Sequence, residues 1–108
     1  MTEEGRKYLS DILIAINLIE QFTKDTPDFE TYQADLKTQS AIERQLAIVG
    51  EALNKFRRTV PEVNIKHAQQ IIAFRNRLVH AYDSIDNAIV WAILQNHLPK
   101  LKEEIAKK

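Results

Sequence analysis

Apolar residues recur along this chain every three or four positions, the spacing that places side chains on one face of an α-helix. The pattern predicts a first helix over about residues 3–24, which ends at Thr26-Pro27, and a second long helix over about residues 38–58. The apolar positions are Leu9, Ile12, Leu13, Ile16, Ile19 and Phe22 in the first, and Ile42, Leu46, Val49, Leu53 and Phe56 in the second. Residues 28–36 between them predict a loop or a short helix.

Two features of these helices indicate close packing. Ile14 and Leu18 widen the apolar face of the first helix, and a helix that is apolar on most sides favours a bundle with an oligomer interface. Thr38 or Ser40 is a suitable N-cap for the second helix. Gly50 lies inside that helix, where it costs about 1 kcal/mol relative to Ala, so we expect another helix to approach closely there.

The second half of the chain predicts two more helices. A connector at 60–64 ends in Asn64, a good N-cap for a helix over about residues 65–80, and Asp83 or Ser84 is then expected to cap a last helix. Pro99 should kink or restart that last helix. The sequence therefore predicts one all-α domain over residues 1–108, an up-and-down bundle of four long helices plus a short one.

Composition narrows the function without naming it. The 108 residues carry 15 basic and 15 acidic side chains, which argues against binding nucleic acid through net charge but leaves room for a small local basic site. The absence of cysteine excludes disulfides and thiolate chemistry. The N-terminus has no signal-peptide pattern, and the apolar run from Ile12 to Leu18 is too short to cross a bilayer, so we expect a soluble cytoplasmic protein.

Residues 75–82, Arg-Asn-Arg-Leu-Val-His-Ala-Tyr, concentrate the side chains able to do chemistry. Arg75 falls in the apolar stripe of the helix predicted over 65–80, and a cation placed there needs a partner or a function. The structural interpretation is an ion pair with Glu51 across the bundle, and the functional one is a bound phosphate. His80 is either a helix C-cap or a proton carrier, and Asn76, four positions earlier, shares its face and is suited to orient it.

Arg75 and His80 are five positions apart, so on an unbroken helix they point about 140° from one another. They can cooperate within one chain only if the helix frays before His80; otherwise a second copy must bring its own pair alongside. Arg, His and Asn without a metal cluster are compatible with metal-independent RNA scission, in which the 2′-hydroxyl attacks the adjacent phosphate, but composition alone does not select that reaction.

The block fits Arg-x4-His-x-Tyr and resembles the signature of the HEPN superfamily, specifically the HepT toxins of HepT/MntA toxin–antitoxin pairs. Residues 42–52, Ile-Glu-Arg-Gln-Leu-Ala-Ile-Val-Gly-Glu-Ala, are similar to that family's mid-chain helix, and Tyr82–Asp86, Val90-Trp91 and Leu98-Pro99 to its last helix. The resemblance implies a helical homodimer whose Arg and His motifs line a cleft at the interface, and an endoribonuclease activity against cellular RNA that needs no cofactor.

The resemblance also implies a partner. The family's antitoxin is a minimal nucleotidyltransferase that uses ATP, with Mg, to transfer AMP to the motif tyrosine, which here is Tyr82. A phosphodiester-linked AMP adds negative charge and bulk where RNA must enter.

Two hypotheses follow for the function. In the first, the protein is a toxin in which His80 is the general acid and base, Arg75 stabilises the phosphate, Asn76 orients substrate or His80, Glu51 supports Arg75 and Tyr82 accepts AMP. In the alternative, it is a non-catalytic nucleotide-binding or regulatory subunit of a nucleotidyltransferase, which suits its zero net charge.

The remaining polar and aromatic candidates receive structural interpretations. We interpret the cluster of Lys55, Arg57 and Arg58 as complementing the helix dipole, with RNA backbone contact as the alternative. His67 and His97 are interpreted as surface or core-edge residues rather than metal ligands, and Trp91 as a core residue.

Overall fold

A computed structural model describes residues 1–80 and 85–108, and the regular structure in these ranges is helical throughout. The elements are α1 (Glu3–Phe22), α2 (Phe29–Gln33), α3 (Leu36–Thr59), α4 (Gln69–His80), α5 (Asn87–Ala92), a π-helical turn (Ile93–His97) and α6 (Leu98–Ala106). The last three follow one another without a break and together form the predicted final helix. The predicted all-α fold of four long helices and one short helix is therefore confirmed.

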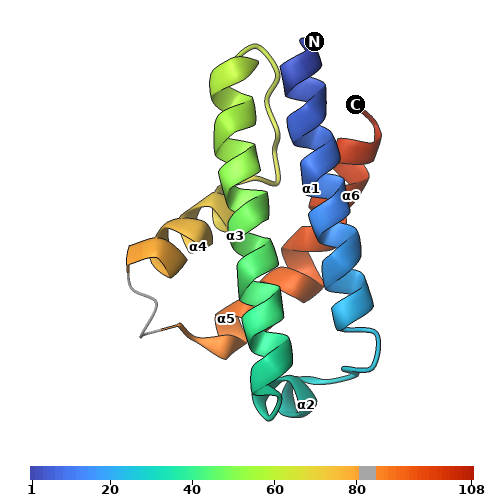
Figure 1. Cartoon of the computed structure of the whole chain (residues 1–108), viewed down its shortest axis with the longest axis vertical. Helices are drawn as coiled ribbons and strands as arrows, with labels where there is room; N and C mark the ends of the chain where they lie inside the picture. Colours follow the sequence, from blue (N-terminus) through green and yellow to red (C-terminus); the bar gives the residue numbers. More distant parts are fainter. Residues whose placement is uncertain (81–84) are drawn as a thin grey trace.

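The helices pack into an elongated bundle that measures 42 × 28 × 19 Å. Figure 1 shows α1 and α3 running antiparallel side by side, and these two helices make the most extensive contact in the bundle. Helix α4 packs against α3, and α6 packs against α1. Among the described residues, no helix is long and apolar enough to cross a membrane.

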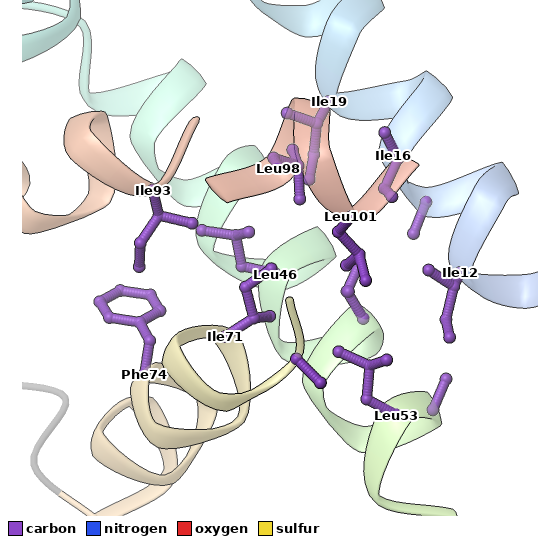
Figure 2. Packing of buried hydrophobic residues seen from close by; sticks show 14 of the residues in the cluster. Ile12, Ile16, Ile19, Leu46, Leu53, Ile71, Phe74, Ile93, Leu98 and Leu101 are labelled. Carbon is purple, nitrogen blue, oxygen red and sulfur yellow. The ribbon is translucent and has the colours of Figure 1, made fainter. Parts of the chain in front are cut away.

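The core lies where α1, α3, α4 and the last helical run converge (Figure 2). Ile12, Ile16, Leu46 and Leu53, which the helical periodicity selected, are fully buried. Phe22, which the periodicity also selected, is instead 39% exposed, and Tyr32, which it did not select, is fully buried. Burying each such side chain stabilises the fold by roughly 1.5–3 kcal/mol, before the entropy cost of ordering it.

Three of the described helices begin after an aspartate N-cap: Asp28 for α2, Asp35 for α3 and Asp86 for α5. Helix α3 begins at Leu36 because Asp35 is its N-cap: the Thr38 amide donates to Asp35 Oδ1 over 3.0 Å, and the Thr38 hydroxyl donates to Oδ2 over 2.6 Å. The prediction that Thr38 or Ser40 caps this helix is therefore wrong. Asp86 caps α5, accepting from the Ala88 amide over 2.8 Å, while the predicted caps at 83 and 84 lie outside the described residues.

The helix that carries the motif begins later than predicted. It starts at Gln69 rather than residue 65, so Asn64 is not its N-cap. The reason is a long-range contact: the backbone amides of Lys66 and His67 donate to the Glu104 carboxylate of α6, over 2.7 and 3.0 Å. These amides are satisfied from outside, which holds residues 66 and 67 in a loop ahead of α4.

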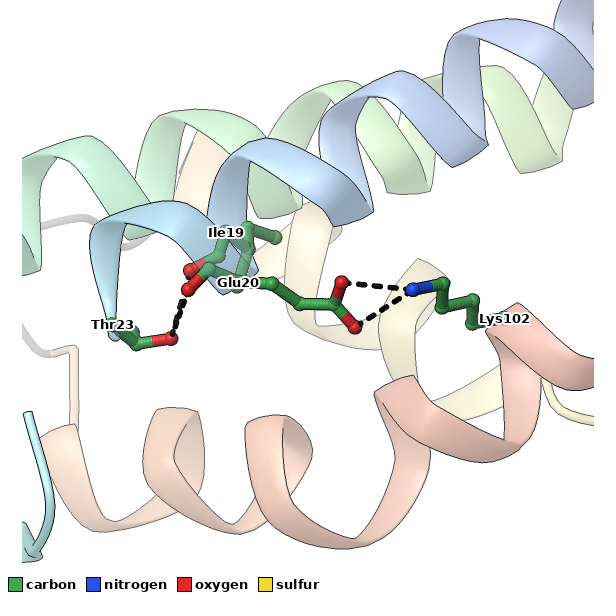
Figure 3. Close-up of polar contacts among 4 residues, drawn as sticks. All are labelled: Ile19, Glu20, Thr23 and Lys102. Atoms are coloured by element: carbon green, nitrogen blue, oxygen red, sulfur yellow. Dashed lines mark hydrogen bonds and ion pairs between the residues drawn. The ribbon is translucent and has the colours of Figure 1, made fainter.

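Pro99 occupies one of the first two positions of α6, directly after the π-helical turn. Proline has no amide hydrogen to donate, and the wider turn before it accommodates the missing bond. The predicted kink or restart takes the form of a change from π-helical to α-helical turns one residue before Pro99, without a break in the helical run. Helix α6 is then joined to α1 by an exposed ion pair, in which Lys102 Nζ reaches the two Glu20 oxygens at 2.8 and 3.1 Å (Figure 3).

The short helix α2 packs against α5 through aromatic rings. Trp91 lies 5.6 Å from Tyr32 and 6.5 Å from Phe29, measured between ring centroids. The prediction that Trp91 is a core residue is wrong: its side chain is half-buried and packs at the edge of the core. Tyr32 is fully buried, and its burial, with the nearby charge of Glu43, raises the pKa of the phenol well above its ordinary value.

Candidate active site

Gly50 is the point at which α4 approaches α3. A Cβ atom placed on Gly50 would lie 2.4 Å from Arg75 Cβ, 2.9 Å from Arg75 Cγ and 3.2 Å from the carbonyl oxygen of Ile71. The stem of Arg75 therefore rests on the backbone of α3, in space that a side chain at position 50 would occupy. The close approach expected from an internal glycine is confirmed, and the helix that approaches is the one that carries the motif.

The guanidinium of Arg75 is held by two side chains. Its Nη2 atom forms an ion pair with Glu51 Oε2, and its Nη1 atom donates to Asn76 Oδ1 over 3.3 Å. The Arg75 side chain is 24% exposed and that of Glu51 34% exposed, so solvent and ligands can still reach the pair. A cation that is fixed in direction and partly open is suited to receive a phosphate group.

His80 does not join this group within one chain. Helix α4 continues as far as His80 without fraying, so the imidazole leaves the helix about 140° away from Arg75. The His80 side chain is exposed, and so is that of Asn76, whose oxygen accepts from Arg75. Tyr82, the predicted AMP acceptor, lies outside the described residues.

The Arg75 side chain lines a groove of about 720 Å³ between α1 and α3. Glu51 lies on its α3 side, and Val79, one turn beyond Arg75, reaches it from α4. Three large apolar side chains that line the groove are unusually exposed: Ile14 at 57%, Val79 at 49% and Ile48 at 36%. The polar site and an exposed apolar strip (Ile14, Ile48 and Val79) therefore share one surface.

The groove also contains cations outside the Arg-x4-His-x-Tyr motif. Lys7 on α1 and Arg44 and Lys55 on α3 line it together with Arg75. Lys55 had been interpreted with Arg57 and Arg58 as complementing the helix dipole, with RNA backbone contact as the alternative, and Lys7 and Arg44 had no assigned role. The spacing 44, 48, 51, 55 places Arg44 and Lys55 on the same α3 face as Glu51, although only the packing of α1 makes that face part of a groove.

Comparison with known proteins supplies the family. Residues 12–107 match the family model described as "Ribonuclease HepT-like". The chain is 37% identical to "Probable ribonuclease HepT" of Thermococcus cleftensis, over 99% of this chain and 97% of that protein. It is 35% identical to "Putative RNase MJ1380" of Methanocaldococcus jannaschii, over 93% of this chain and 92% of the relative.

No solved structure matches the chain. The family match covers nearly the whole chain, including α3, α4 and the groove residues of α3. It agrees with the resemblance that residues 75–82 indicated. The chain belongs to the HepT-like ribonuclease family.

Proposed function

We propose that this protein is the toxin of a toxin–antitoxin pair, an endoribonuclease that cuts cellular RNA in the cytoplasm without a metal ion. The observation that carries the proposal is the placement of Arg75 in a chain of this family. The guanidinium is anchored by Glu51 and Asn76 at an open groove, where a substrate phosphate can reach it.

The proposed reaction is an internal transfer at phosphorus. The substrate's 2′-oxygen attacks the adjacent phosphorus, the bond to the 5′-oxygen breaks, and the products carry a 2′,3′-cyclic phosphate and a 5′-hydroxyl. His80 takes the proton from the 2′-hydroxyl and returns a proton to the leaving oxygen, the general acid–base role that histidine most often fills. Arg75 stabilises the negative charge on the non-bridging oxygens, and Asn76 helps to hold that guanidinium.

The active form is proposed to be a homodimer, because Arg75 and His80 diverge on a single α4. A two-fold axis places the same surface of both copies face to face. The exposed apolar strip beside Arg75 is a surface that gains stability from being covered. A copy packed there brings its own α4 alongside, so that His80 of one copy can act with Arg75 of the other.

Mixing two inactive variants tests the shared site. Arg75→Ala and His80→Ala should each abolish cleavage, whereas a mixed dimer has one site that retains both groups. Equal mixing with exchange makes about half of the dimers mixed, each with one of two sites intact, so about a quarter of wild-type activity should return. If activity stays at the level of the single variants while subunits exchange, each chain supplies its own pair or the histidine role is wrong.

Regulation is proposed to act through Tyr82, two positions after His80. A cognate minimal nucleotidyltransferase would transfer AMP from ATP to the phenol oxygen and release pyrophosphate. The added phosphodiester would repel the RNA backbone from the site. Incubation with the cognate enzyme, ATP and Mg should add the mass of AMP to the wild type and none to Tyr82→Phe, with loss of cleavage only in the former.

The first experiment is cleavage itself. Purified protein whose Tyr82 is unmodified by mass is incubated with cellular RNA in a chelator, with His80→Ala beside it. Cleavage by the wild type alone, leaving 2′,3′-cyclic phosphate ends, supports the proposal. If neither protein cuts, yet the wild type binds nucleotide, the non-catalytic subunit hypothesis replaces it.

A further inference from the structure

We propose that Arg44 and Lys55 bind RNA phosphates on either side of the one that is cut, a proposal that rests on the ribonuclease function above. Both residues lie on α3, outside the Arg-x4-His-x-Tyr motif, and both line the groove that Arg75 enters. Their role would be to bind and align the strand, while Arg75 acts on the scissile phosphate.

The placement follows from helical spacing. Positions 44, 48, 51 and 55 are separated by four, three and four residues, so their side chains form one row along α3. Glu51, the partner of Arg75, stands inside that row. With a rise of 1.5 Å per residue, Arg44 lies about 10 Å along the axis on one side of Glu51 and Lys55 about 6 Å on the other.

The charges of the groove single out these two cations. Its two carboxylates are already engaged: Asp11 pairs with Lys7 at 3.2 Å, and Glu51 pairs with Arg75. Among the described residues, no carboxylate lies within 4.0 Å of the Arg44 or Lys55 side-chain nitrogens. The groove thus holds four cations and two acids, a positive excess in a chain whose net charge is zero.

A polyanion complements this excess better than a second copy does. In a two-fold dimer each groove residue faces the same surface of its partner, so positive groove meets positive groove. The apolar strip can be covered in that arrangement, because the long stems of Arg44 and Lys55 can carry their charges to the rim. The exposed charges then flank the shared site, where an RNA strand offers one negative charge per phosphate.

The test measures how binding depends on salt. The probe is a fluorescent single-stranded RNA of mixed sequence with 2′-O-methyl groups, which cannot be cut because the attacking hydroxyl is blocked. Affinity is measured by anisotropy over a salt series for the full-length wild type and for Arg44→Ala/Lys55→Ala. Each phosphate contact contributes about 0.7 to the slope of log K against log salt for a single strand, so the slope should fall by about 1.4.

A matched control separates contact from net charge. Lys24→Ala/Lys100→Ala also removes two positive charges, but from exposed positions that do not line the groove. This control should keep the wild-type slope. The swap Arg44→Lys/Lys55→Arg keeps both charges and should keep most of the slope as well.

Cleavage of an ordinary RNA provides the second measurement. Arg44→Ala/Lys55→Ala should raise KM at least tenfold and leave kcat close to the wild-type value, because phosphates away from the reaction are bound equally in ground and transition states. Arg75→Ala should lower kcat instead. A fall in kcat with an unchanged KM in the double variant would overturn the assigned role.

Other outcomes also decide the question. An unchanged salt slope, or an equal fall in the Lys24/Lys100 control, overturns the proposal. So does intact RNA binding combined with an altered oligomeric state, which would assign the two cations to a protein interface. A wild type that binds the probe with the expected slope loss in the variant, but cuts no RNA, leaves the phosphate contacts standing and removes the ribonuclease function.

Discussion

Replacing Gly50 by alanine tests whether the contact between α3 and α4 sets the position of Arg75. The added methyl group would lie 2.4 Å from Arg75 Cβ, an atom fixed by the α4 backbone rather than the far end of a flexible side chain. Ordinary carbon–carbon contact needs about 3.5–4.0 Å, so α4 must move outward by about 1 Å. Arg75 and its contact with Glu51 move with it.

Two opposing terms set the effect of Gly50→Ala on the free energy of unfolding. Alanine is favoured over glycine in a helix interior by about 1 kcal/mol. Overpacking a close contact costs about 1–3 kcal/mol. We therefore expect a net loss of roughly 0–2 kcal/mol, together with a fall in kcat of up to about a hundredfold, because a displacement near 1 Å in an active site has an effect of that size.

Urea unfolding and RNA cleavage measure the two consequences. The propensity term is calibrated at Ser40, an exposed position of α3, by comparing Ser40→Gly with Ser40→Ala. The steric term is the difference between the change in the free energy of unfolding from glycine to alanine at position 40 and the same change at position 50, provided the m-values agree. If Gly50→Ala stabilises the protein as much as the step at position 40 does and leaves kcat unchanged, the helices do not meet at Gly50 and the reasoning is refuted.

Three other variants test the contacts around the site and its supporting helices. Glu51→Gln removes the charged partner of Arg75 and should lower kcat roughly tenfold with little change in KM, measured by steady-state cleavage; an unchanged kcat would mean that Arg75 is held by other groups. Hydrogen bonds from Thr38 lower the pKa of Asp35 below its usual 3.8, so its contribution to stability is present above that pH and is lost as the pH falls through the folded-state pKa. Asp35→Asn should therefore flatten the loss of stability below about pH 4 in urea titrations, and an acid limb as steep as that of the wild type would contradict the cap. Glu104→Gln weakens the bonds to the amides of residues 66 and 67 and should speed hydrogen exchange there by roughly tenfold, while exchange in the middle of α3 stays unchanged.

The sequence predicted the helices because their packing depends on periodicity. Ile12, Leu46 and Val49 recur at helical spacing and are fully buried. The errors fell at helix ends, where one side-chain hydrogen bond decides the boundary. Asp35 was passed over because it precedes the apolar pattern, and the start of α4 depends on Glu104, which lies 37 and 38 positions away from the amides it accepts.

The same division between local and long-range information applies to the site. The pairing of Arg75 with Glu51 could be inferred, because a cation in an apolar stripe needs a partner and the bundle brings the two helices together. The contributions of Arg44 and Lys55 to the groove could not be inferred from the sequence. An exposed cation on a helix is an ordinary feature, and its role becomes visible only when the neighbouring helices are in place. The groove exists only in the packed bundle, between α1 and α3.

The contact between α2 and α5 also contains an intrinsic fluorescent probe. Trp91 is the only tryptophan of the chain, and it lies against Tyr32 and Phe29, in the first helix after residues 81–84. The fluorescence emission of Trp91 therefore reports on the contact between α2 and α5 alone, whereas far-ultraviolet circular dichroism reports on every helix. Coincident unfolding transitions would mean that the contact between α2 and α5 unfolds with the whole bundle. An earlier change in fluorescence emission would mean that this contact opens as a separate unit.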